Sequence, residues 1–255
     1  DDPPCSDDTR KTKKKPFDFV VNEESILFEV ERTARELFPR AKPGESAPFL
    51  KEEDLYFPFF SSMRAEIDLG VKDLGQLGKL LQTPGLFEGL ASDEPLVDII
   101  SGPKGPVMDR RRLTEAFRTL YDRVLDLAVD APNKADIVML LEPLKFRSIT
   151  KSSAYRTFVL KAFQRKMHAR LRKMPQFCLI GDPSVPDALD RVFGKTQEGA
   201  RFFSGDFSAA TDNLRSRASE VAGTCVLESF GISEENPLYE LFLDSLTGFT
   251  LPNPD

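Results

Sequence analysis

Apolar residues recur at three- and four-residue intervals through most of the chain, and this spacing predicts a mainly helical protein. In the stretch 155–174, for example, Leu160, Phe163, Met167 and Leu171 fall on one stripe. The same spacing predicts further helices over 23–38, 71–82, 93–100, 107–129, 186–193, 214–229 and 236–245. Proline or glycine follows several of these stretches, which marks where the helices end.

Shorter apolar runs predict a few strands between the helices. The run from Ile137 to Leu141 is typical of a strand or of a buried helix segment. In the next segment, 145–151, basic and apolar residues partly alternate, which favours a half-exposed strand with its cations on one face. Strands are also expected over 176–180 and 200–207. The predicted fold class is therefore α+β, mainly helical.

The composition narrows the classes of protein to consider. With 255 residues, of which 40% are hydrophobic and 30% charged, the chain is long enough for one large domain or two modest ones. Three scattered cysteines and a single histidine, His168, argue against a zinc site and fit a reducing compartment. We find no apolar run of membrane-spanning length and no signal peptide. We therefore expect an intracellular protein that is not secreted.

Basic residues are concentrated in one part of an otherwise acidic chain. Ten of the 35 Lys and Arg residues, and none of the 41 Asp and Glu residues, lie between Lys145 and Lys173. The formal charge of −6 therefore combines +10 in this segment with −16 in the rest of the chain. A localised basic segment indicates a polyanionic partner, and the alternative is a solvated helix face.

Two carboxylates lie six positions apart in the sequence SGDFSAATDNL, residues 204–214. Asp206 falls at the end of an expected strand, and the small residues that follow let a phosphate group approach the backbone closely. Divalent cations that assist phosphoryl transfer are usually held by one or two carboxylates together with phosphate oxygens. Asp206 is therefore a candidate metal ligand, whereas Asp212 is equally suited to cap the helix that follows it.

The stretch DFSAATDNL resembles motif A of the RNA-directed RNA polymerases of narnaviruses, mitoviruses and ourmia-like viruses. These share an Asp, an aromatic or aliphatic residue, and then Ser-Ala-Ala-Thr/Ser-Asp. The resemblance implies that Asp206 is catalytic and binds Mg²⁺ or Mn²⁺. It also implies that Asp212 and Asn213 lie near the ribose of the incoming nucleotide, whose 2′-OH distinguishes RNA from DNA.

The segment 145–151 resembles motif F of the same polymerases, a basic element of the fingers that lies over the triphosphate. Lys145, Arg147 and Lys151 match its cations, which would stabilise the negative charge that develops on the phosphates. Arg156 is expected to face the nucleotide or the template. In the helix that follows, the residues expected to contact the RNA backbone are Lys161, Arg165, Lys166 and Arg170. As in the family, the motif F-like segment precedes the motif A-like one.

The resemblance covers about 130–255 and implies a right-hand polymerase of a positive-strand RNA virus, acting in the host cytoplasm or in mitochondria. The expected parts are a flexible arm (1–16), an N-terminal extension with helical fingers (17–130), fingers with the basic strand and helix (131–199), and the first strand and helix of the palm (200–255). The implied partners are an RNA template, the nascent RNA and nucleoside triphosphates.

The chain departs from the family in one respect. Motif B and the Gly-Asp-Asp turn of motif C are not present, because the only Gly-Asp pairs are those ending at Asp182 and Asp206. We therefore expect a fragment that lacks the rest of the palm and the thumb and that does not polymerise RNA alone. Two alternatives stay open: a non-enzymatic RNA-binding protein that uses 145–173, and a purely structural origin of both patterns.

Overall fold

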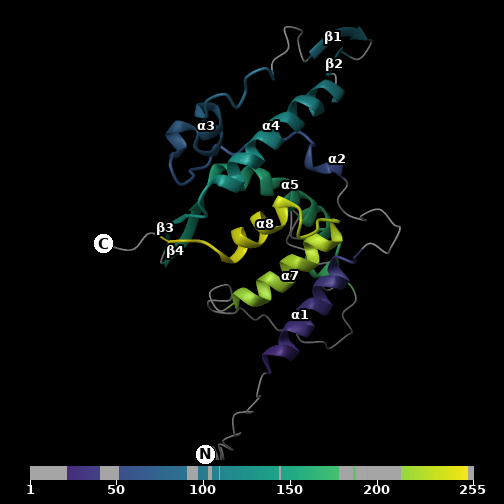
Figure 1. The fold of residues 1–255 in the computed structure, drawn as a ribbon, viewed down its shortest axis with the longest axis vertical. Helices are drawn as coiled ribbons and strands as arrows, with labels where there is room; N and C mark the ends of the chain where they lie inside the picture. Colours follow the sequence, from purple (N-terminus) through teal and green to yellow (C-terminus); the bar gives the residue numbers. More distant parts are fainter. Residues whose placement is uncertain are drawn as a thin grey trace, which may run out of the picture.

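Helices form most of the described structure, and two small antiparallel sheets complete an α+β fold (Figure 1). The computed structural model describes residues 22–40, 52–90, 97–102, 105–108, 110–143, 145–177, 186–187, 194 and 214–251. The helices are α1 (Glu23–Leu37), α2 (Glu52–Leu55), η1 (Val71–Asp73), α3 (Gly75–Gln82), α4 (Arg110–Asp130), α5 (Ala154–Leu171), η2 (Pro175–Phe177), α7 (Ser216–Ser229) and α8 (Pro237–Thr247). The strands are β1 (Val97–Gly102), β2 (Gly105–Met108), β3 (Ala135–Glu142) and β4 (Lys145–Ser152). The α+β, mainly helical prediction is confirmed, whereas the division into fingers and palm stays a prediction.

Local sequence signals account for the ends of several helices. The Asn22 side chain accepts a hydrogen bond from the backbone N–H of Glu24 at the start of α1, and Asn236 does the same for α8. Gly231 follows α7 with a φ of 74°, and its backbone N–H donates to the carbonyl of Glu228. For these three helices the expected bounds, 23–38, 214–229 and 236–245, differ from the observed ones by at most two residues.

Several sequence predictions were wrong in part. Residues 107 and 108 of the helix expected over 107–129 belong to β2, and the helix expected over 71–82 is divided into η1 and α3 at Leu74, whose φ is 64°. Of the expected helix over 93–100, residues 97–100 are instead the start of β1, and residues 93–96 lie outside the described residues. β1 pairs antiparallel with β2 and places Gly102 opposite Gly105. The β-branched residues Ile99 and Ile100 favour a strand, and the pairing partner only comes after a turn. The expected strand at 176 and 177 is part of the 3-10 helix η2.

The hydrophobic core lies mainly between α4 and α5, with α7 and α8 packed against them (Figure 1). Tyr121 and Val124 of α4 and Val159 and Phe163 of α5 are almost fully buried. Each such side chain contributes on the order of 2 kcal/mol by leaving water. Leu227 of α7 belongs to the same buried cluster. One core therefore includes residues from the expected parts 17–130, 131–199 and 200–255.

Helix α1 packs along α7 at one end of this core (Figure 1). Arg35 forms an ion pair with Glu228 at 2.8 Å, and the rings of Phe38 and Phe230 meet edge to face with their centroids 6.3 Å apart. Helix α8 contacts the other side of the bundle and packs against α4, α5 and α7. The C-terminal half of α5 lies at the edge of the core, where Met167 and Leu171 still pack against it.

Candidate nucleic-acid interface

The hairpin of β3 and β4 carries the cations of the motif F-like segment. The two strands pair in continuous antiparallel register, from Ala135 opposite Ser152 to Glu142 opposite Lys145. Because side chains alternate along a strand, Arg147 and Lys151 lie on the same face. Arg147 is exposed and Lys151 half-buried. The predicted half-exposed strand with cations on one face is confirmed for these two residues.

The partner strand changes the charge of this hairpin. Asp136 lies directly opposite Lys151, and Glu142 lies in register with Lys145. Opposite charges at facing positions of an antiparallel pair attract each other weakly, by about 0.2–1 kcal/mol. The basic segment 145–173 contains no acid in the sequence, but the fold brings two acidic residues of β3 beside it. The hairpin is therefore less positive than the sequence alone indicates.

The hairpin leads directly into α5, which divides into a buried half and an exposed half. Buried positions, among them Phe158, Val159 and Phe163, occur only up to residue 163. No described residue from 164 to 174 is fully buried. The exposed half contains most of the helix's cations, so α5 anchors the basic segment in the core at one end and presents it to solvent at the other.

Arg156 belongs to the buried half of α5, and its side chain contacts other parts of the protein. Its guanidinium forms an ion pair with Asp244 at 2.9 Å and donates to the backbone carbonyl of Ala131 at 3.1 Å. The residue is only 7% exposed. The sequence placed Arg156 beside the nucleotide or template, but in the structure it joins α5, α8 and the end of α4. The sequence contains no local signal for this, because Asp244 is 88 residues away.

The four cations that the sequence assigned to the RNA backbone differ in their surroundings. Lys161 donates to the amide oxygen of Gln164 at 2.8 Å, and Arg170 donates to the backbone carbonyl of Leu37 at 3.1 Å. Lys166 pairs with Asp54 at 2.6 Å. The guanidinium of Arg165 lies over the rings of Phe57 and Phe59, 5.1 and 5.7 Å from their centroids. Within the described part of the chain, Lys161 and Arg165 form no ion pair.

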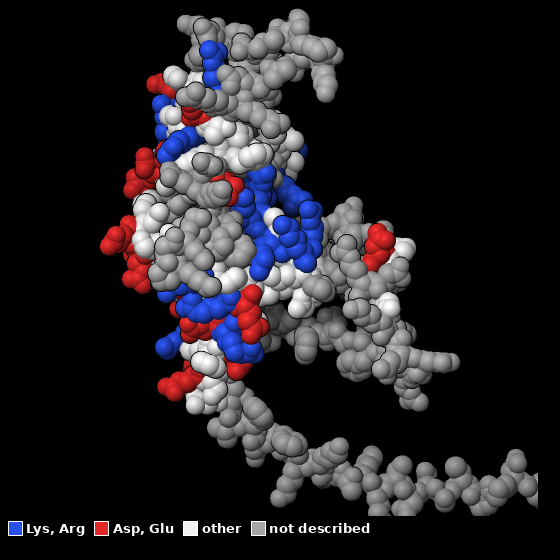
Figure 2. All heavy atoms as spheres, turned by 90° about the vertical axis from the view of Figure 1, so that its right-hand side faces the viewer, with Lys and Arg blue, Asp and Glu red and all other residues white. Residues whose placement is uncertain are grey.

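Figure 2 shows where these charges gather. Lys and Arg side chains cluster at mid-height on the face that forms the right-hand side of Figure 1, at about the height of α5. Most Asp and Glu side chains in this view lie toward one edge instead. On this face the cations are therefore concentrated at mid-height, whereas positive and negative side chains are mixed below them. Such a local cluster is typical of surfaces that bind polyanions.

The motif A-like residues lie outside the described residues. This applies to Asp206, Asp212 and Asn213, and so to the expected metal site and ribose contacts. Within the described residues, no group of three His, Cys, Asp or Glu side chains is placed to hold a metal ion. The Mg²⁺ or Mn²⁺ ligand at Asp206 stays a prediction from sequence.

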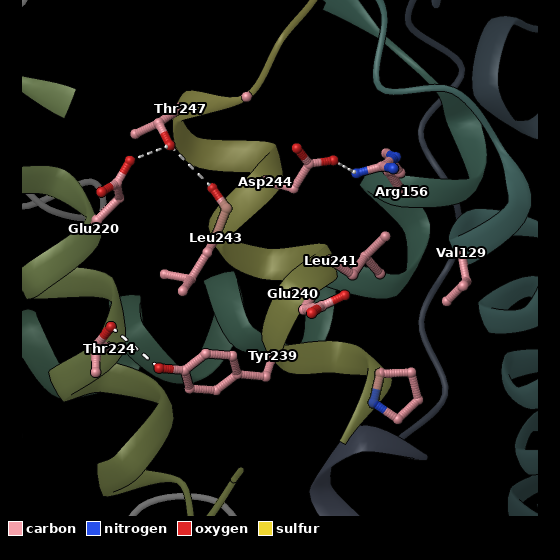
Figure 3. Close-up of a pocket in the computed structure, with 12 residues that line it drawn as sticks. Val129, Arg156, Glu220, Thr224, Tyr239, Glu240, Leu241, Leu243, Asp244 and Thr247 are labelled. Carbon is pink, nitrogen blue, oxygen red and sulfur yellow. Dashed lines mark hydrogen bonds and ion pairs between the residues drawn. The ribbon is translucent and has the colours of Figure 1, made fainter. Parts of the chain in front are cut away.

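A cavity of about 770 Å³ lies beside α8, but its charge does not suit a phosphate (Figure 3). Glu220, Glu240 and Asp244 line the cavity. Among the described residues that line it, Arg156 is the only Arg or Lys, and it is already paired with Asp244. In Figure 3, Thr247 lies between α7 and α8, where its hydroxyl donates to Glu220. An excess of carboxylates repels phosphate groups. The basic residues of β4 and of α5 are therefore better candidates for contacts with a nucleic acid than this cavity is.

Sequence reasoning missed the aromatic partners of the basic helix. Phe57 and Phe59 come from the segment after α2, more than 100 residues before Arg165. The run Tyr-Phe-Pro-Phe-Phe at 56–60 was an available signal, because five such residues in a row are rarely all buried. Nothing in the sequence, however, linked this run to α5.

The comparisons with known proteins identify no relative. No family model matches the chain, and neither the curated proteins nor the solved structures include a match. Among the described helices, none combines the length and the apolar character needed to cross a membrane.

Proposed function

We propose that this chain is the RNA-binding fingers part, with the first palm elements, of a viral RNA-directed RNA polymerase. The observation that carries the proposal is the basic segment 145–173, which lies on an exposed strand and on the exposed half of α5. Further support comes from the sequence, where a motif F-like segment precedes the motif A-like stretch around Asp206. Arg147 and Lys151 would bind nucleotide phosphates, and the cations of α5 would bind the template backbone.

Asp206 is the residue proposed to act in catalysis. A divalent cation held there would neutralise the phosphates during nucleotidyl transfer. The chain's own basic residues would hold the triphosphate in place and offset its charge. Asp212 and Asn213 would test for the ribose 2′-OH.

RNA binding is tested by neutralising the proposed phosphate contacts. Arg147→Ala with Lys151→Ala should weaken binding to a fluorescein-labelled single-stranded RNA roughly ten-fold. The slope of log K against log salt is negative, and its magnitude should fall by about 0.7 per lost contact. The matched control is Lys72→Ala with Arg217→Ala, which removes two exposed cations outside the segment. Equal loss of affinity in both double variants, measured by fluorescence anisotropy, would contradict the proposal.

The catalytic role is tested in the full-length protein. Asp206→Ala should lower metal-dependent nucleotide incorporation by about a thousand-fold, because it removes several kcal/mol of charge stabilisation. RNA affinity should change less than two-fold. Asp130→Ala, at an exposed position at the end of α4, is the control for loss of a carboxylate.

A non-enzymatic RNA-binding protein is the second candidate. The exposed basic strand and helix account for RNA binding without any metal site, and this observation favours it. The two candidates differ in a single result. If neither the wild type nor Asp206→Ala incorporates nucleotides and both bind RNA equally well, the second candidate replaces the first.

A further inference from the structure

The segment after α2, residues 56–60, contains two aromatic rings that pack inward and two that are exposed. Along residues 56–60, Tyr56 and Phe59 point into the protein and pack against its core, whereas Phe57 and Phe60 are exposed by 60% and 97%. An exposed Phe forgoes the roughly 2 kcal/mol that its burial would contribute. Two largely exposed rings within one short segment therefore indicate a binding surface.

The inner rings fix the position of this segment. The Phe59 ring lies 5.1 Å from the ring of Phe117 and 4.9 Å from that of Phe158, between α4 and α5. The Tyr56 ring meets the Tyr121 ring edge to face at 5.5 Å. To bury Phe57 and Phe60, the segment would have to withdraw these inner rings from a close-packed core. The outer rings are thus held outward by the packing of the inner ones.

Cations of the bundle lie against the same segment. Arg165 of α5 stacks over the ring of Phe57 at 5.1 Å, and Arg118 of α4 lies 4.6 Å from the centroid of Tyr56. Lys166 forms an ion pair with Asp54 of α2, next to Leu55, the buried residue that directly precedes the segment. The exposed ring of Phe57 therefore lies beside the basic C-terminal half of α5, and Phe60 follows it three positions later in the same segment.

From this arrangement we infer that Phe57, Phe60 and Arg165 form a stacking surface for unpaired RNA bases, with the α5 cations binding the adjacent phosphates. Aromatic rings interleaved with arginines are the usual means of binding single strands, since each base offers a flat face and each nucleotide a phosphate. Charge complementarity selects RNA over a protein partner, because four cations on or just after α5 are exposed: Lys161, Arg165, Arg172 and Lys173. The inference rests on the proposed RNA binding and assigns its base contacts.

The first test uses loss of a ring. Phe60→Ala should weaken the binding of an unstructured single-stranded RNA about ten-fold. In this variant the slope of log K against log salt should stay unchanged, because stacking releases no counterions. Arg165→Ala, in contrast, should reduce the magnitude of that negative slope by about 0.7. The matched control is Phe28→Ala, which removes a ring exposed by 63% on α1. Circular dichroism and urea unfolding show whether each variant folds as the wild type does.

The second test reports on stacking directly. The chain contains no Trp, so Phe60→Trp introduces a single fluorophore at the proposed surface. Its emission should be quenched by single-stranded RNA and should not change on addition of duplex RNA of the same length, whose bases are already stacked.

The outcomes separate this inference from the proposed function. If wild-type protein binds RNA but Phe60→Ala binds it equally well and Phe60→Trp is not quenched, the stacking surface is wrong and RNA binding stands. If the wild type does not bind RNA, both fail. If Phe60→Ala instead abolishes self-association of the protein while RNA affinity is unchanged, the rings form a protein contact and the inference is overturned.

Discussion

Single residues in the core have roles that the described contacts define well, and Tyr121 is one. It is almost fully buried in α4, and its hydroxyl donates to the backbone carbonyl of Val159 in α5 at 3.1 Å. Burial raises the pKa of this hydroxyl well above its ordinary value of 10.0, and the neighbouring Tyr56 and Asp122 raise it further. The side chain therefore favours the folded state in its neutral form.

This raised pKa predicts a loss of stability in alkaline solution. Below pH 10 the neutral Tyr121 contributes its full stabilisation, and Tyr121→Phe should lower the free energy of unfolding by about 1 kcal/mol. Above pH 10 the unfolded state loses its proton first, so the advantage of wild type over Tyr121→Phe should fall by about 1.4 kcal/mol per pH unit. Urea unfolding at pH 8, 10 and 11 measures this, with Tyr239→Phe as the control. A difference that is constant across this range would contradict the prediction.

Arg156 leads to a prediction about stability rather than affinity. Removing it leaves Asp244 and the carbonyl of Ala131 without their partner, but Asp244 is partly exposed and water can reach it. We expect Arg156→Ala to lower the free energy of unfolding by about 2 kcal/mol, less than for a fully buried pair. Urea unfolding measures this, and Lys161→Ala on the exposed side of the same helix should change it by less than about 0.5 kcal/mol. Equal stability of the two variants would show that the Arg156 contacts contribute little.

Among the elements, the β3–β4 hairpin differs most from the rest of the fold. It has two strands, and Ile137, Met139, Leu141 and Phe146 on one face are exposed. A two-stranded hairpin without a packed face is only marginally stable. The helices α4 and α5, in contrast, contribute to the main core.

The hairpin should therefore open more readily than the helices. In hydrogen–deuterium exchange, the amides of 137–150 should exchange at least about ten-fold faster than those of 157–163 in α5. If β4 contacts a nucleic acid, addition of single-stranded RNA should slow exchange in the hairpin and leave α8 unchanged. Protection of the hairpin equal to that of α5 in the free protein would contradict this prediction.

For the molecule as a whole, the packing of α1 on α7 determines the environment of Cys225. This thiol is buried, and burial raises its pKa, so it is a poor nucleophile in the native protein. Arg35 and Glu31 of α1 are close enough to influence it. Its chemical reactivity therefore reports whether α1 is in place.

Removal of α1 should expose this thiol. In the full chain, we expect Cys225 to resist iodoacetamide at pH 8 and to be alkylated only on unfolding. Deletion of residues 1–38 should accelerate its alkylation at least about ten-fold, as measured by mass spectrometry of the Cys225 peptide. Arg35→Ala, which removes only the ion pair with Glu228, should have a smaller effect because that pair is partly exposed. Unchanged alkylation after the deletion would show that α7 and α8 alone bury the thiol.

The sequence predicted most described helices because their signals are local. The apolar stripe of α4 and the Asn caps of α1 and α8 depend on residues within a few positions. In α5, by contrast, the buried positions lie only between 154 and 163 and include Arg156. The prediction was wrong for β1, whose strand depends on pairing with β2. The candidate site was predicted less well, since Asp136 opposite Lys151 and Phe57 beside Arg165 are contacts between separate elements.

The sequence by itself determined the mainly helical fold class, the helix ends and the separation of a basic segment from an acidic remainder. It also contains the polymerase-like motifs. Only the tertiary structure decided that Arg156 is buried against Asp244, that α5 exposes cations along one half, and that aromatic rings from the segment after α2 lie beside them. The physical reason is distance along the chain: caps and stripes act between near neighbours, whereas burial and ion pairing depend on which distant elements pack together.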